Sequence, residues 1–206
     1  MRYAALNFGT GMRPIAHLSS YGGFVPNSGQ DAAAPTRISD EHLYALAQYI
    51  YSLRAPKSPY LMDARARRGE RIFTTQGCNF CHPAPLYTNN KLTPADGYDV
   101  PDEDARKYDV LPIRVGTDPW LAIKTRRGTG YYKVPSLKGV WYRGPFEHNG
   151  SVLKLEDWFD PARLRDDYEP TGWAGPARSR AVKGHRFGLN LNVEDRADLI
   201  AFLKTL

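Results

Sequence analysis

Apolar positions near the beginning of the chain repeat with the period of an amphipathic helix. They are Leu43, Leu46, Ala47, Ile50 and Leu53, and they follow Ser39, whose hydroxyl suits a helix N-cap. Pro56 must end this helix, and the proline-containing residues 55–60 then predict a stiff linker. Residues 1–38 are rich in Gly, Ser, Ala and Pro without a sustained period, so we expect irregular chain there. The pattern therefore separates an N-terminal segment, residues 1–55, from residues 56–206.

Two further helices are predicted near the two ends of the second segment. The first runs from about Asp63 to Gln76 and stops at Gly77, which permits a left-handed turn. The second begins near Asn192, an effective N-cap that acidic residues follow. Its apolar face carries Leu199, Phe202, Leu203 and Leu206. These two helices are expected to frame the second segment.

The long region between these helices, residues 83–180, contains most of the prolines and only short apolar pieces. We expect it to be mostly loop, with one short helix near Leu155 to Phe159. So long an irregular stretch is unusual in a compact domain unless something else organises it, and a large buried cofactor would do so. The expected fold class is mainly α, with long irregular loops around such a group.

Composition and charge exclude several classes of protein. The chain has 206 residues, 42% of them apolar, and its 28 Lys and Arg against 22 Asp and Glu give a net charge of +6. The basic residues are mostly dispersed, without the aromatic interleaving of a nucleic-acid surface, so we expect no nucleic-acid partner. No apolar run is long enough for a membrane span. Residues 1–25 also lack the pattern of a secretory signal.

The strongest motif is Cys78-Asn79-Phe80-Cys81-His82. This spacing lets two thiols reach the two vinyl groups of one porphyrin while the adjacent imidazole approaches the iron. A redox CxxC would be expected in a strand-to-helix context, and a zinc site would need two further ligands at short spacing. The chain has no other cysteine. We therefore predict one covalent haem c, tethered by Cys78 and Cys81, with His82 as the proximal ligand.

The motif and its surroundings resemble a class I cytochrome c domain. The resemblance rests on residues 68–73, on Gly77 with the CNFCH motif, and on the final helix at residues 199–203. It implies that Gly69 and Phe73 mark the place where the first helix of the domain crosses the last, near Leu199 and Phe202. A small residue allows close approach at such a crossing.

The resemblance also bears on the sixth iron ligand. The methionines, Met1, Met12 and Met62, all precede the CxxCH motif. His185, seven residues before Asn192, stands where class I cytochromes place the distal ligand, and Gly184 and Gly188 beside it suit a loop pressed against a porphyrin. We assign His185 as the distal ligand; His148 and an open or water-bound iron are the alternatives. Two imidazole ligands predict a low-spin haem of comparatively low potential.

A second resemblance covers roughly residues 41–206. Residues 131–167, above all 133–140 and 144–151, are similar to the C-terminal haem domain of di-haem cytochrome c peroxidases and related haem rubber oxygenases. Those proteins carry two haems, whereas this sequence has one CxxCH. The resemblance implies that residues 1–55 are a remnant of, or a connection to, a preceding haem domain.

Two functions follow from these resemblances, and they leave open whether the chain is an enzyme. One is one-electron transfer to or from a redox partner protein or an upstream haem domain. The other is the low-spin relay half of a two-haem peroxidase- or oxygenase-like oxidoreductase. Covalent haem attachment at CxxCH takes place outside the bacterial cytoplasmic membrane, so we expect a periplasmic or otherwise exported protein.

Three minor assignments complete the predictions. Trp141 and Trp158 could relay electrons, although large aromatic residues are more often core. Arg126 and Arg127 could pair with haem propionates, or lie solvated at the surface. The acidic residues between 96 and 109 could supply oxygen ligands to calcium, but they lack the EF-hand pattern, and a solvated polar loop is the preferred interpretation.

Overall fold

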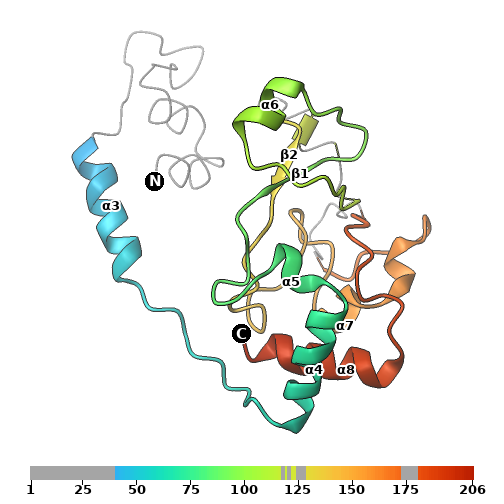
Figure 1. Ribbon diagram of the computed structural model, residues 1–206. Coiled ribbons are helices and arrows are strands. Elements are labelled where there is room, and N and C mark those ends of the chain that lie inside the picture. The colour runs from blue at the N-terminus through green and yellow to red at the C-terminus, as the bar shows by residue number, and fades with distance from the viewer. Residues whose placement is uncertain (1–39, 117–118, 120–121, 124–128, 173–180) are drawn as a thin grey trace. The chain divides into compact units, whose positions relative to one another are not determined.

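The computed structural model describes residues 40–116, 119, 122–123, 129–172 and 181–206 (Figure 1). The chain divides into two compact units, residues 1–55 and 56–206. The described part of the first unit is one helix, α3 (Asp40–Ser52), in which Leu43 and Ala47 are buried. The helix ends before Pro56, as the sequence predicts, whereas Leu53 lies beyond its end and is exposed. Ser39, the expected N-cap, lies outside the described residues.

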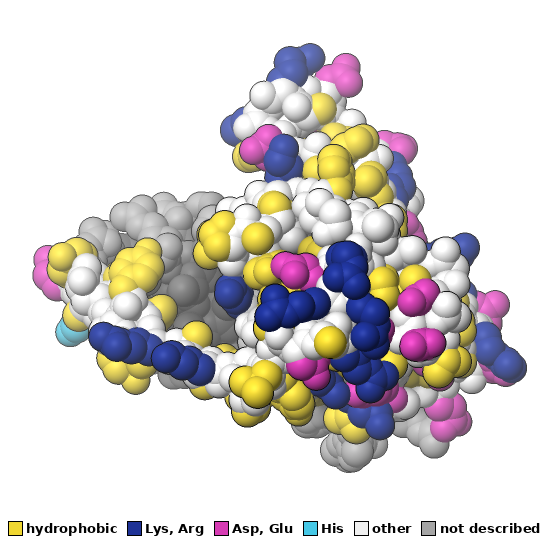
Figure 2. All heavy atoms as spheres, turned by 60° about the horizontal axis from the view of Figure 1, so that its bottom comes forward, with side chains coloured by type: hydrophobic (Ala, Val, Ile, Leu, Met, Phe, Trp, Pro, Cys, Tyr) yellow, Lys and Arg dark blue, Asp and Glu magenta, His cyan; other side chains and the backbone are white. Residues whose placement is uncertain are grey.

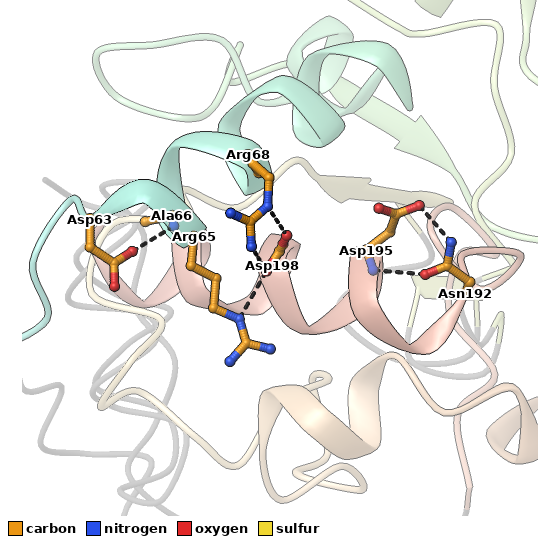
Figure 3. A network of polar contacts seen from close by, with 7 residues as sticks. All are labelled: Asp63, Arg65, Ala66, Arg68, Asn192, Asp195 and Asp198. Carbon is orange, nitrogen blue, oxygen red and sulfur yellow. Dashed lines mark hydrogen bonds and ion pairs between the residues drawn. The ribbon is translucent and has the colours of Figure 1, made fainter.

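Two capped helices form the frame of the second unit. α4 (Ala64–Thr75) begins at Asp63, whose carboxylate accepts a hydrogen bond from the amide of Ala66 at 2.8 Å. α8 (Val193–Lys204) begins at Asn192, whose side-chain oxygen accepts from the amide of Asp195 at 2.8 Å (Figure 3). Each cap satisfies a backbone N–H that has no partner within the helix. Both helices therefore start where the sequence predicts.

The crossing of α4 and α8 depends on Gly69. A Cβ atom at this position would lie 2.0 Å from the carbonyl oxygen of Asp198 and 2.8 Å from Cβ of Phe202. Only glycine fits between backbones this close. One turn further along α4, Phe73 packs edge-on against Phe202 with 5.3 Å between the ring centroids. The expectation that Gly69 and Phe73 mark this crossing is confirmed.

The core of the unit forms around this crossing. Its buried residues come from both helices, from the turn at Val140 and from the short helix α7 (Leu155–Trp158). They are Phe73, Val140, Leu155, Phe159, Leu199, Ile200, Phe202 and Leu203. α7 matches the short helix predicted near residues 155–159, and the 3₁₀ helix η3 (Pro161–Leu164) follows it.

An ion-pair network also joins α4 to α8. Asp198 is buried, and its carboxylate accepts hydrogen bonds from Nε of Arg65 at 2.8 Å and from Nε of Arg68 at 2.7 Å (Figure 3). Burial alone would raise the pKa of Asp198, but the bonds from the two guanidinium groups outweigh it and hold that pKa below its ordinary value. Both arginines keep about half of their side-chain surface exposed, and Lys and Arg side chains gather near the middle of the face in Figure 2.

The region between the helices contains more regular structure than predicted. β1 (Leu92–Pro94) pairs with β2 (Tyr131–Lys133) in an antiparallel two-stranded sheet, with Thr93 opposite Tyr132. A further helix, α6 (Asp102–Lys107), lies between them in the sequence. Strands of three residues are too short to show a period of two, which is why the sequence pattern missed them. The rest of the described region is mainly turn and loop, as expected.

Part of the acidic stretch at residues 96–109 forms the helix α6, and the remainder is turn and loop, as expected. Asp102, Glu103 and Asp104 occupy the first turn of α6, and Arg106 and Lys107 its last, a distribution that the helix dipole favours. The hydroxyl of Tyr131 in β2 donates to Asp104 at 2.9 Å. In the part of the chain that the structure describes, no group of three or more His, Cys, Asp or Glu side chains is arranged to hold a metal ion.

The described unit is thus helix-rich, with one small sheet. None of its helices, nor α3, has the length and apolar character needed to span a membrane.

Candidate functional site

The CxxCH motif forms a helical turn of its own. Gly77, with φ of 73°, ends the α4 segment and precedes α5 (Cys78–Cys81). The amide of His82 donates to the carbonyl of Cys78 at 2.9 Å, which continues the turn. Residues at spacings of three and four share one face of a helix, so Cys78, Cys81 and His82 are presented on the same side.

The protonation of the two thiols argues against redox chemistry at this pair. Burial raises the pKa of Cys78 to about 11, and it raises the pKa of Cys81 as well. Dithiol oxidoreductases and nucleophilic cysteines work through a lowered pKa and a thiolate. Neither thiol therefore has the lowered pKa expected of a reactive dithiol.

His82 is held in a defined tautomer by the loop that follows it. Its Nδ1 lies 3.1 Å from the carbonyl oxygen of Tyr87, which can only accept, so Nδ1 carries the proton. Burial lowers the pKa of His82, and hydrogen bonds to the carbonyls of Tyr87 and Pro135 partly oppose this. The ring is therefore neutral near pH 7, and its Nε2 lone pair can serve a metal.

The segment that follows β2 supports this loop. The amide of Leu137 donates to the carbonyl of Tyr87 at 3.1 Å, and the hydroxyl of Thr88 donates to the carbonyl of Val134 at 2.7 Å. The hydroxyl of Ser136 donates to the carbonyl of Leu86 at 2.5 Å. The run at residues 133–140, which carries part of the resemblance, therefore fixes the carbonyl that orients His82.

His185 lies in the loop before α8 and interacts electrostatically with His82. Burial, then the charge of Arg163 and the charge of His82, lowers the pKa of His185 to about 3. Its Nδ1 is buried and has no hydrogen-bond partner among the described residues. The ring contacts Trp158 and Phe187, with centroids 5.3 and 5.4 Å away. The fold thus places two imidazoles that are 103 positions apart in the sequence within range of an electrostatic interaction.

His148, the alternative ligand, is placed differently. It is exposed and stacks on Tyr132 in β2, with 5.2 Å between the ring centroids. Of the two other expected participants, Trp158 lies beside His185, whereas Trp141 packs edge-on against Tyr60 and Tyr142. Arg126 and Arg127 lie outside the described residues.

Two charged residues that the sequence analysis missed lie against the loop at residues 183–185. The guanidinium of Arg163, fully buried in η3, donates to the carbonyls of Trp158, Lys183 and His185. Burial raises the pKa of Glu147 to about 7, although the charge of Arg163 opposes this. A charged residue in an irregular stretch gives no sequence signal of burial, so nothing in the pattern could have indicated either one.

The donor set suits a c-type haem. One helical turn and its C-cap supply two thiols and an imidazole, and a second neutral imidazole with an unpartnered ring nitrogen interacts electrostatically with the first. A buried polar atom without a partner costs about 1–3 kcal/mol, which is why such groups recur where a ligand binds. The residues present therefore fit an iron porphyrin held by two thioether bonds and two nitrogen ligands.

Comparisons with known proteins point in the same direction. No known family model matches the chain. Cytochrome-c peroxidase IdrP1 of Pseudomonas sp. (strain SCT) is 25% identical over 168 residues, which cover 70% of this chain and 40% of that protein. The protein of the same name from Denitromonas iodatirespirans is 25% identical over 175 residues, 70% of this chain and 41% of that protein.

Two further similarities involve MauG. Methylamine utilization protein MauG of Methylorubrum extorquens is 24% identical over 206 residues, 93% of this chain and 51% of that protein. A solved structure of a MauG-like protein associated with microbial copper homeostasis is 20% identical, with a TM-score of 0.42 over 71% of this chain and 47% of that one. The chain spans between two fifths and about half of the length of the curated relatives. It is a distant homologue of proteins named cytochrome-c peroxidase and MauG.

Proposed function

We propose that residues 56–206 form a cytochrome c-like domain that transfers single electrons through one haem c. Cys78 and Cys81 are the tethers, and His82 and His185 are the two axial ligands. The observation that carries the proposal is the imidazole of His185: its buried Nδ1 has no partner among the described residues, and it interacts electrostatically with His82 of the CxxCH turn. A bound haem supplies a one-electron iron couple at this place.

The protein's own groups would prepare and protect this centre. The carbonyl of Tyr87 accepts from Nδ1 of His82, which fixes the ring orientation and increases its donor strength. Trp158 and Phe187 pack against His185 and limit the access of water to it. Two imidazole donors favour ferric iron, so a low-spin centre of comparatively low potential is expected.

The setting of the domain is part of the same proposal. Residues 1–55 would be the remnant of a preceding haem domain or the connection to one, and that domain or a separate redox protein would exchange electrons with this one. The chain would work in the periplasm or otherwise outside the cytoplasmic membrane. The share of the relatives' length that it spans is consistent with half of a two-domain arrangement.

A second candidate function is supported by the names of two relatives, both cytochrome-c peroxidases. In this alternative the domain is the low-spin relay half of a two-haem oxidoreductase that acts on peroxide, or on an organic substrate with dioxygen. An iron with two histidine ligands has no vacant position for such a substrate. The chemical step would then belong to the other haem.

The test is electron paramagnetic resonance of the oxidised, haem-loaded protein beside two histidine variants. The unmutated protein is expected to give a low-spin signal, His185→Ala a high-spin signal, and the control His148→Ala no change. A low-spin signal that survives in His185→Ala and becomes high-spin in His148→Ala would exchange the two assignments. A high-spin signal already present in the unmutated protein would refute ligation by two histidines and favour an enzyme that binds peroxide or dioxygen.

A further inference from the structure

Arg163 is the largest fully buried side chain in the described residues. Removing a guanidinium from water is costly unless its donors find partners in the interior. A charge buried at this cost next to a candidate iron ligand calls for a physical explanation. The contacts of the side chain supply one.

The guanidinium connects two stretches of backbone that are distant in the sequence. Its Nε donates to the carbonyl of Trp158, at the end of α7, at 2.6 Å. Its Nη1 donates to the carbonyl of Lys183 and its Nη2 to the carbonyl of His185. A guanidinium is planar and rigid, so these bonds fix the relative positions of the carbonyls that accept them. Because two of these bonds are accepted by the carbonyls of Lys183 and His185, they fix the backbone that carries the His185 side chain.

The side chain of Trp158 forms a second connection between the same groups. The Arg163 guanidinium lies over its ring, 4.8 Å from the centroid, and the His185 ring packs edge-to-face against it with 5.3 Å between the ring centroids. Trp158 is therefore held by Arg163 and contacts His185. The position of the His185 imidazole is therefore restricted both by its own backbone and by the neighbouring Trp158 ring.

Gly184 completes this arrangement. It has φ of 60°, and a Cβ atom there would lie 2.2 Å from Oε1 of Glu147 and 3.4 Å from Nη1 of Arg163. The carboxyl group of Glu147 thus packs against the loop at Gly184, where there is no side chain to obstruct it. The absence of a side chain at position 184 permits the close packing of Glu147, Arg163 and the loop.

We propose that Arg163 is the positioning residue of the distal ligand: its fork on the carbonyls of Lys183 and His185 holds the His185 imidazole against the iron. This inference rests on the proposed function. When the fork is lost, the loop can move away, and external ligands then reach the iron more easily. The role is exerted through His185, since Arg163 itself makes no contact with the iron.

The experiment compares cyanide binding to the oxidised, haem-loaded protein with its Arg163→Lys and Arg163→Met variants. Loss of a hydrogen bond from a charged donor corresponds to about a ten- to hundredfold change in an equilibrium constant. Arg163→Met is expected to accelerate cyanide binding by about that factor and to raise the high-spin fraction, with added imidazole restoring the low-spin signal. Arg163→Lys keeps the positive charge without the forked guanidinium, so its cyanide-binding rate should lie between those of the unmutated protein and Arg163→Met.

A matched control lies two residues away. Arg165 is exposed, and its guanidinium pairs with Asp167 at the surface, so Arg165→Met should leave the cyanide rate unchanged. If Arg163→Met does not fold, Gly184→Ala retains the arginine but crowds the loop, and it should also accelerate cyanide binding. A merely structural role would lower the melting temperature of the Arg163 variants without changing spin state or cyanide rate, and that result would overturn the inference.

The failure of this inference can be told apart from the failure of the proposed function. If His185→Ala leaves the ferric spectrum unchanged, His185 is not the ligand and both proposals fail. If His185→Ala produces a high-spin signal while Arg163→Lys and Arg163→Met bind cyanide as slowly as the unmutated protein, only the role of Arg163 is refuted.

Discussion

Gly69→Ala should separate the two helices that frame the second unit. On an exposed helix this substitution would gain about 1 kcal/mol, because alanine has the higher helix propensity. At Gly69 the new Cβ would lie 2.0 Å from the carbonyl oxygen of Asp198, whereas ordinary contacts begin at 3.4 Å. It would also lie 2.8 Å from Cβ of Phe202. The obstructing atoms are backbone and Cβ atoms, so no side-chain rotation can relieve the overlap.

The size of the destabilisation follows from how far α4 and α8 must separate to accommodate the new Cβ atom. The helices would have to separate by roughly 1 Å at their crossing, where Phe73, Leu199 and Phe202 are packed with almost no exposed surface. Overpacking of a core costs about 1–3 kcal/mol and occasionally more. Because the displaced contact is between backbones, we expect a cost at or above the top of that range. After the propensity gain, the free energy of unfolding should fall by about 2 kcal/mol or more.

Urea unfolding followed by circular dichroism measures this change. Arg67→Ala provides the control, since Arg67 is exposed on the same helix and its replacement should change the free energy of unfolding by less than about 0.5 kcal/mol. A Gly69→Ala protein as stable as its parent, or more stable, would refute the close approach of α4 and α8.

Three further predictions concern buried charge and capping. Asp198→Asn removes a buried ion pair and should lower the free energy of unfolding by about 1–3 kcal/mol at pH 7; the loss is limited because the two half-exposed arginine partners can turn to solvent. Since the pKa of Asp198 is depressed, the difference between the two proteins in urea titrations should shrink below about pH 4. Burial raises the pKa of Glu147 to about 7, so its ionisation opposes folding as the pH rises, and Glu147→Gln should be the more stable protein at pH 8, by up to about 3 kcal/mol, but not at pH 4. A pH-independent difference in its melting temperature would contradict this. Asn192→Ala should cost about 1 kcal/mol in thermal unfolding, and Asn190→Ala, outside the helix, much less.

The sequence by itself determined the features that neighbouring residues encode. Asp63 and Asn192 cap their helices because a short polar side chain reaches a backbone amide two or three residues on, whatever the rest of the fold does. Gly77 ends its helix for an equally local reason. The spacing of Cys78, Cys81 and His82 places their side chains on one face through the geometry of a single turn.

Only the tertiary structure decided which charged residues are buried and what they contact. Nothing in the sequence pattern indicates that Asp198 and Arg163 are buried, yet each is almost completely buried and bonded to partners from another segment. The pairing of β1 with β2 and the electrostatic interaction of His185 with His82 likewise connect residues about 40 and 103 positions apart. Such contacts form only when distant segments of the chain pack together, and neither a local hydrophobic period nor a helix cap indicates which segments will do so.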